Sequence, residues 1–212
     1  LQIQTLQMIG QTSISKSFYL TGGTALAAYY LQHRYSVDLD FFTDDPTATA
    51  RVPSAMKEVA QKLDIEIAFV RTLDTFLECF LRAPNGERVE MDFAVDTPYR
   101  LEPTQLDVTL NIQIDNLTDI ACNKLSALFD RAEPKDFVDI YFLCQEAFSF
   151  KDLVERTRQK HVGLDDYWLA VALRRVEQVE FLPRMIKPVT VEQLKEFFLN
   201  QAKTLMEVIG DK

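Results

Sequence analysis

Asp38 and Asp40 are the residues whose type and spacing point first to chemistry, because they alternate with apolar neighbours across residues 37–43. Alternate side chains of a β-strand lie on one face, so both carboxylates would point the same way from Cα atoms roughly 6.6 Å apart. Like charges at that spacing repel, and a bound cation relieves the repulsion. The chain has only two histidines, and carboxylates favour hard ions over zinc. We therefore predict a Mg²⁺ or Mn²⁺ site; a solvated pair without a metal is the alternative.

Gly22 and Gly23 separate a short apolar run, residues 17–21, from a helix-forming run, residues 24–32. The free N–H groups and the positive dipole end at a helix start attract anions, and glycine lets a phosphate approach the backbone closely. An ordinary strand-to-helix turn has the same pattern. A phosphate site followed by a metal site is, however, what binding of a nucleoside triphosphate (NTP) requires. We therefore predict an NTP site.

A predicted β-hairpin adds a third acidic position. Its strands, residues 76–82 and 88–95, flank Asn85-Gly86, the residue pair that most strongly signals a tight hairpin turn. Asp92 lies on the polar face of the second strand. We assign it as the third metal ligand and as the general base toward an incoming hydroxyl group. The solvent side of an edge strand is the alternative interpretation.

Lys124 falls on the apolar face of a predicted helix. The positions that define this face are Leu117, Ile120 and Leu128. A lysine there either extends its ammonium group to solvent or meets an anion, and beside an NTP site we predict contact with phosphates. Asp139 lies among apolar residues of the next helix, where an unpaired carboxylate would be costly. It needs a cationic partner, and Lys124 or Arg131 is the obvious choice.

The elements that must position these residues change character near residue 116. Before it, strand-like and helical stretches alternate; the further predicted strands are residues 65–71 and, more weakly, 108–114, and residues 52–63 form a helix. After it the apolar spacing is helical only. We predict an α+β fold with a catalytic half, residues 1–115, and a helical half, residues 116–212. No linker rich in Gly, Pro or Ser separates them, so they should pack as one compact unit.

Composition excludes several classes of protein. A formal net charge of −9 argues against broad electrostatic capture of nucleic acid. The sequence contains no apolar run of roughly 18 residues and no apparent secretory signal, so we predict a cytoplasmic protein with no membrane association. Its three cysteines are widely spaced, which fits neither a disulfide framework nor paired zinc ligands.

The candidate site residues described above, together with their neighbours, resemble a known sequence signature. Residues 20–26, Leu-Thr-Gly-Gly-Thr-Ala-Leu, followed by His33-Arg34, Ser36 and residues 38–42, Asp-Leu-Asp-Phe-Phe, are similar to the first motif of the nucleotidyltransferase AbiEii/AbiGii toxin family. The segment from Lys124 through Arg131 to residues 135–141 resembles the later motifs of that family. The resemblance covers residues 18–143.

The resemblance implies a polymerase-beta-like nucleotidyltransferase core, a mixed sheet with helices, followed here by a C-terminal helical bundle. It implies NTP binding at Gly22 and Gly23, to which we add Thr24 and Ser36 of the same motif. It also implies metal binding by Asp38 and Asp40, with functional roles for Lys124 and Asp139. Toxins of the family act in abortive-infection or type IV toxin–antitoxin systems, and some modify the acceptor end of tRNA. The implied partners are therefore a tRNA or protein acceptor and a cognate antitoxin.

The predicted reaction is attack of an acceptor hydroxyl on the α-phosphorus of a metal-bound NTP, with release of pyrophosphate. A kinase-like transfer of the γ-phosphoryl group from the same NTP site is one alternative, and it would release a nucleoside diphosphate instead. A catalytically silent binding module is another. Failure to bind ATP with magnesium would favour the silent module.

Overall fold

The protein is described by a computed structural model that covers residues 1–96 and 99–210. Its internal contacts divide the chain into two compact units. The sheet unit comprises Leu1–Leu26 and Ser36–Asn116, and the helical unit comprises Ala27–Tyr35 together with residues 117–212, of which the last two lie outside the described residues. The helical unit thus includes a short segment from the first half of the chain. That the two halves pack as one compact body stays a prediction.

A seven-stranded mixed sheet of order β3-β4-β5-β2-β1-β7-β6 forms the centre of the sheet unit within the described residues. The strands are β1 Tyr19–Thr21, β2 Leu39–Thr43, β3 Glu66–Thr72, β4 Phe76–Arg82, β5 Arg88–Val95, β6 Gln105–Asp107 and β7 Ile112–Ile114. Three antiparallel strands, β3, β4 and β5, form one side. The central pairs β2–β5 and β1–β7 are parallel, so the sheet joins segments that are distant in sequence.

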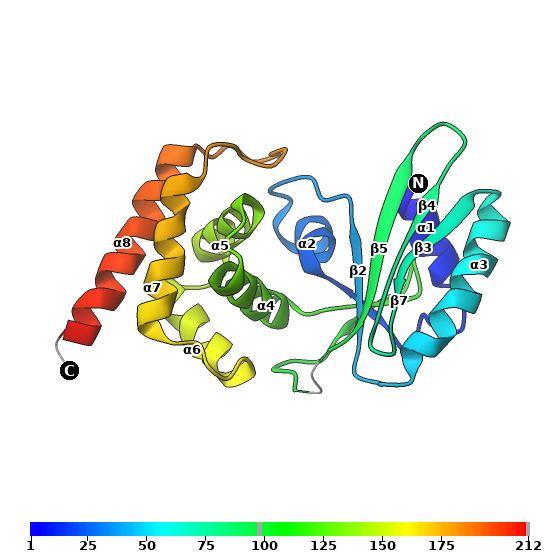
Figure 1. The fold of residues 1–212 in the computed structure, drawn as a ribbon, viewed down its shortest axis with the longest axis horizontal. Helices are drawn as coiled ribbons and strands as arrows, with labels where there is room; N and C mark the ends of the chain where they lie inside the picture. Colours follow the sequence, from blue (N-terminus) through cyan, green and yellow to red (C-terminus); the bar gives the residue numbers. More distant parts are fainter. Residues whose placement is uncertain (97–98, 211–212) are drawn as a thin grey trace. The chain divides into compact units, whose positions relative to one another are not determined.

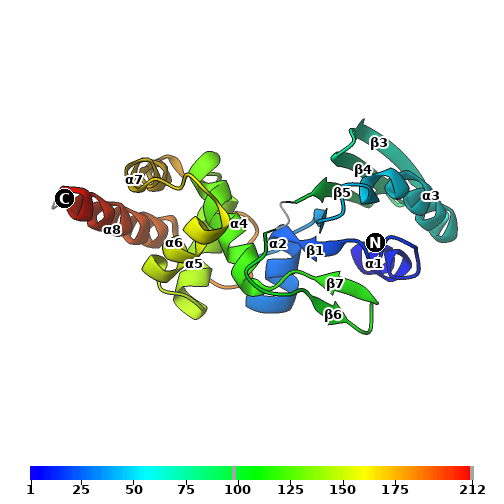
Figure 2. The ribbon, with the colours of Figure 1, turned by 90° about the horizontal axis from the view of Figure 1, so that it is seen from below.

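The two faces of the sheet differ in polarity. Helices α1 (Gln2–Ile9) and α3 (Val52–Leu63) lie on one face (Figure 2), above a buried apolar layer. In that layer the rings of Phe41 and Phe93 stack at 5.2 Å between centroids. Along β2 the burial alternates, as predicted, so that Asp40 lies on the opposite, polar face. A short 3-10 turn, Ala48–Arg51, leads into α3.

Helix α2 (Gly22–Ala25) directly follows β1 and continues as a π-helix over Leu26–Leu31. The helical unit (Figure 1) contains five further helices in the described residues, with a 3-10 turn at Arg175–Gln178. They are α4 Leu117–Asp130, α5 Pro134–Glu146, α6 Phe150–Lys160, α7 Asp166–Arg174 and α8 Val191–Gly210. Phe137 of α5 and Phe198 of α8 meet edge to face at 5.0 Å in its core. No helix of the described residues is long and apolar enough to cross a membrane.

Two local predictions differ from the structure. Strand β2 begins at Leu39, whose first partner is Met91, so Asp38 precedes the strand and Val37 is 65% exposed. The helix begins at Gly22 itself, without an intervening turn.

Candidate functional site

Three carboxylates form a row across the polar face of the sheet. Thr21 of β1 is the register partner of Asp40 in β2, Asp40 is the partner of Asp92 in β5, and Asp92 is the partner of Glu78 in β4. Neighbouring strands lie about 4.8 Å apart. The fold therefore places Asp40 and Asp92, which come from distant parts of the sequence, directly beside each other.

Asp38 lies two residues before Asp40, just ahead of β2, and is exposed. Its backbone carbonyl accepts a short hydrogen bond from the Thr24 hydroxyl group. Thr24 is in the first turn of α2, so this bond ties the start of the helix to the acidic segment. The structure thereby brings Thr24, Asp38 and Asp40 into one locality.

Asp92 is in an environment that disfavours its own negative charge. Burial, followed by repulsion from Asp40 and Glu78, raises the pKa of Asp92 from its ordinary value near 3.8 to about 6. Its Oδ1 atom is buried and has no hydrogen-bond partner among the described residues. An unsatisfied oxygen amid like charges is chemically suited to a divalent cation.

The carboxylates around Asp92 fit magnesium better than a metal whose ligands must all come from protein side chains. No group of three His, Cys, Asp or Glu side chains in residues 1–96 and 99–210 is already arranged to hold an ion. Mg²⁺ commonly takes only one or two carboxylates and completes its shell with substrate phosphates and water. Asp40 and Asp92 would suffice for that mode of binding.

The raised pKa of Asp92 predicts a pH-dependent stability change. A carboxyl group whose pKa is higher in the folded state destabilises that state progressively above pH 3.8, and fully above about pH 6. Without metal, Asp92→Asn should therefore raise the free energy of unfolding at pH 8 by roughly 1 kcal/mol after allowance for solvent screening. At pH 4 it should change little. Thermal melts at both pH values, with and without Mg²⁺, test this. An equal effect at the two pH values would contradict it.

Gly22 is required by a close approach of the Asp40 carboxylate. Its φ is +67°, and a Cβ built at this position would lie 1.9 Å from Asp40 Oδ2. Thr21, which precedes the helix, provides no side-chain cap to the free N–H groups. Those groups therefore remain suited to an anion, beside the carboxylate that would hold a metal.

Gly22→Ala should abolish NTP binding, because the added methyl group must displace Asp40. Gly86→Ala is the matched control: Gly86 also has a positive φ, +87°, but a Cβ there meets nothing within 4 Å. Backbone strain should lower the stability of both variants by about 1 kcal/mol, and the clash with Asp40 should lower that of Gly22→Ala further. Calorimetric titration with a non-hydrolysable NTP analogue and Mg²⁺ should show binding only for Gly86→Ala. Equal affinities for the two variants would contradict the assignment.

Asp115 anchors the strand end from which α2 starts, and sequence reasoning missed it. It is fully buried; its Oδ2 accepts from the Thr21 hydroxyl group at 2.7 Å, and its N–H donates to the Leu20 carbonyl at 2.9 Å. The same carboxylate forms an ion pair with Arg100. The only sign of Asp115 in the sequence was an acidic residue directly after the weakly predicted strand, residues 108–114.

In the helical unit, the buried carboxylate of Asp139 is surrounded by donors. Arg34 donates to both oxygens, Nε to Oδ1 at 2.6 Å and Nη2 to Oδ2 at 2.8 Å. His33 Nε2 lies 2.7 Å from Oδ1, and Lys124 Nζ lies 2.7 Å from Oδ2. Burial alone would raise the pKa of Asp139, but the Lys124 charge and the hydrogen bonds from Arg34 and His33 outweigh burial and hold it well below its usual range.

Asp139 was predicted to pair with Lys124 or Arg131; its partner is Lys124, and Arg131 instead contacts Asp136 at 2.8 Å. Sequence reasoning did not identify His33 and Arg34 as partners of Asp139, although both belong to the first motif. Because four donors occupy the two oxygens, Asp139 is arranged to fix the position of Lys124 rather than to accept a proton.

The remaining predicted residues lie in the sheet unit. Gly23 is buried in the first turn of α2. Ser36 is partly buried, and its carbonyl accepts from the Gln2 side-chain amide at 3.2 Å. A role for either in nucleotide binding stays a prediction.

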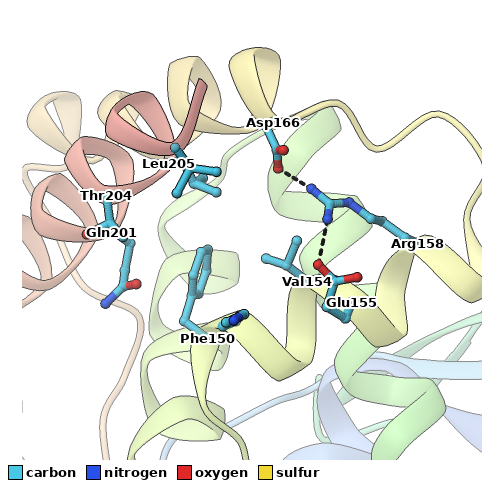
Figure 3. A pocket seen from close by; sticks show the side chains of 10 residues that line it. Phe150, Val154, Glu155, Arg158, Asp166, Gln201, Thr204 and Leu205 are labelled. Atoms are coloured by element: carbon cyan, nitrogen blue, oxygen red, sulfur yellow. Dashed lines mark hydrogen bonds and ion pairs between the residues drawn. The ribbon is translucent and has the colours of Figure 1, made fainter. Parts of the chain in front are cut away.

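A separate hollow of about 380 Å³ lies between α6, α7 and α8 (Figure 3). Phe150, Val154 and Leu205 contribute apolar surface to it. Arg158 at its edge is engaged by Glu155, at 2.6 Å, and by Asp166. None of the predicted site residues lines this hollow.

Two sequence comparisons match almost the whole chain. Residues 5–207 match the model of the family described as nucleotidyl transferase AbiEii toxin, type IV TA system. A protein of Aquifex aeolicus (strain VF5), described as uncharacterized, is 29% identical over 208 residues, which is 97% of this chain and 96% of the relative.

Solved structures share the fold. A putative nucleotidyltransferase from H. pylori has a TM-score of 0.63 at 18% identity, covering 98% of this chain and 92% of its own. MenT4, a nucleotidyltransferase toxin from Mycobacterium tuberculosis, has a TM-score of 0.58 at 16% identity, covering 97% and 81% respectively. The seven-stranded mixed sheet and its helices are thus a nucleotidyltransferase fold.

Proposed function

The chain belongs to the AbiEii nucleotidyltransferase toxin family of type IV toxin–antitoxin systems, and from this premise we propose that it transfers a nucleotidyl group from an NTP to an acceptor hydroxyl in a metal-dependent reaction. The observation that carries the proposal is the packing of the α2 start against Asp40, whose register partner is Asp92. Backbone donors suited to phosphate and carboxylates suited to a metal thus occupy one locality of the sheet unit.

The proposed metal ligands are Asp38, Asp40 and Asp92, and the ion is Mg²⁺ or Mn²⁺. Such an ion supplies positive charge where phosphate oxygens become more negative in the transition state. Asp92 is also the proposed general base toward the acceptor hydroxyl, because its carboxylate lies beside Asp40 on the polar face of the sheet, within the proposed site. The acceptor oxygen attacks the α-phosphorus, and pyrophosphate leaves.

The proposed NTP ligands in the sheet unit are the backbone at Gly22 and Gly23, with Thr24 and Ser36. In the helical unit we assign phosphate binding to Lys124. Asp139 is charge-paired with both Arg34 and Lys124, so its single negative charge does not fully neutralise either cation. Asp139, Arg34 and His33 are then positioning residues for the Lys124 ammonium group.

The biological setting follows from the family. We propose that the chain is the toxin of such a system, that a cognate antitoxin counteracts it, and that the acceptor is a tRNA or a protein. The net charge of −9 argues that an RNA acceptor would be bound at a local site rather than by broad charge attraction.

Labelled nucleotides test this function. The protein is incubated with Mg²⁺ or Mn²⁺, cellular RNA and protein, and each NTP labelled at either the α- or the γ-phosphate. The proposal expects α-label on one acceptor class and release of pyrophosphate. Transfer of γ-label with release of a nucleoside diphosphate would instead establish the kinase-like activity. A folded protein that neither binds nor uses any NTP would be the silent module.

A further inference from the structure

The helical unit contains a segment, residues 184–187, that forms backbone hydrogen bonds with residues 33–35. Two of these residues, His33 and Arg34, contact the Asp139 carboxylate through their side chains. We propose that this segment, named here the clamp, positions His33 and Arg34 and through them the Asp139–Lys124 pair. The proposal rests on the proposed role of Lys124 in the transfer reaction. It gives a function to part of the C-terminal region, to which the sequence motifs described above do not extend.

Backbone hydrogen bonds join the clamp to residues 33–35 on both sides of Arg34. The Tyr35 N–H donates to the Arg184 carbonyl at 2.8 Å, and the Ile186 N–H donates to the His33 carbonyl at 2.8 Å. The Lys187 N–H reaches the same carbonyl at 3.0 Å. Arg34 and Met185 thereby form an antiparallel β-bridge outside the named strands. The carbonyl and amide flanking the Arg34 side chain are thus both fixed.

Residues 33–35 need such support because the helix before them ends abruptly. The π-helix stops at Leu31, and Gln32 adopts a left-handed φ of +50°, which is uncommon for a residue other than glycine. The chain then enters an extended stretch that belongs to no helix or named strand. Within the helical unit, the bridge to Met185 gives this stretch backbone hydrogen-bond partners.

Side chains of the clamp strengthen the same connection. The Arg184 guanidinium lies 4.1 Å from the centroid of the Tyr35 ring. The Lys187 ammonium contacts both carboxylate oxygens of Glu146, at 2.7 and 2.9 Å. Glu146 is the last residue of α5, the helix that carries Asp139. The clamp therefore connects the segment that donates to Asp139 with the helix that presents Asp139.

The clamp is not part of the buried core of the helical unit. Ile186 is 52% exposed, and Arg184 is also exposed. The side chains that the clamp is proposed to position are, in contrast, fully buried: those of His33 and Asp139 have exposures of 0%. Donor–acceptor distances near 2.7 Å in that cluster leave little tolerance, since a displacement of about 1 Å would break the hydrogen bonds.

The test removes one clamp hydrogen bond without changing buried side chains. Ile186→Pro deletes the N–H that donates to His33, whereas the control Ile186→Ala keeps it and trims an exposed side chain. In a pyrophosphate-release assay, Ile186→Pro should lower kcat/KM for the NTP by about ten- to a hundredfold. Ile186→Ala should stay close to the parent protein.

A double-mutant cycle with Lys124→Met separates positioning from general damage. If the clamp acts through Lys124, Ile186→Pro should have little further effect in the Lys124→Met background; independent effects that multiply would overturn the proposal. Should Ile186→Pro not fold, Lys187→Met enters the same cycle, because it breaks only the pair with Glu146 at the surface.

Hydrogen exchange of the Tyr35 amide tests the clamp independently of activity. This amide should be protected in the parent protein and in Ile186→Ala, and should exchange faster in Ile186→Pro. Unchanged exchange would overturn the clamp even if transfer activity is found. Faster exchange in a protein that uses no NTP would instead leave the clamp standing and reject the proposed function.

Discussion

Asp40→Asn should lower the rate of nucleotidyl transfer by about a thousandfold while leaving the fold intact. Asparagine has nearly the same shape, so it fits against Gly22 where a larger residue would not. It removes the negative charge that, with Asp92, is proposed to hold the metal. Loss of that charge also relieves repulsion on Asp92, so the melting temperature without metal should hold or rise.

Glu90→Gln is the matched control for this experiment. Glu90 precedes Asp92 by two positions on the same strand and so shares its face, but its carboxylate pairs with Arg88 at 2.7 Å. Pyrophosphate release and thermal melts are measured for both variants, with and without Mg²⁺. The control should retain most of its activity and its stabilisation by Mg²⁺. If Asp40→Asn turns over within tenfold of the parent rate, the metal site lies elsewhere.

Lys124→Met should reduce kcat/KM by about ten- to a hundredfold, because it deletes a charge-assisted contact to phosphate worth roughly 1.5–3 kcal/mol. It should also lower stability, since Lys124 is one of the cations that pair with the buried Asp139. Arg34 and His33 continue to donate to that carboxylate. The loss of stability should therefore stay below the 3–5 kcal/mol typical of a buried charge left without any partner.

Lys160→Met provides the comparison that separates these two effects. Lys160 is also a buried lysine of the helical unit, and its ammonium group lies 2.7 Å from Asp119 with both side chains fully buried. It belongs to no predicted site. Its substitution should cost stability at least as much as Lys124→Met, yet spare the activity of the folded fraction. A folded Lys124→Met protein with full activity would defeat the assignment of Lys124 to phosphate binding.

Elements governed by local signals were predicted well. The bounds of α3, β4 and β5 agree with the sequence analysis, because an apolar period and the Asn85-Gly86 turn act over a few residues. The burial of Leu39 and Phe41 followed from strand alternation. Helix α6 has weaker local signals, since its sequence is rich in charged residues and carries few apolar positions.

Residue types and short-range patterns already indicate the available chemistry: two aspartates at a strand, two glycines before a helix, and a lysine and an aspartate on apolar helix faces. Contacts between segments distant in sequence establish which of these groups meet. Asp40 meets Asp92 only because β2 and β5 pair in parallel, and Asp139 meets Arg34 and His33 only because residues 27–35 join the helical unit. Local propensities cannot specify such pairings, because strand register and buried ion pairs depend on the free energy of packing segments distant in sequence.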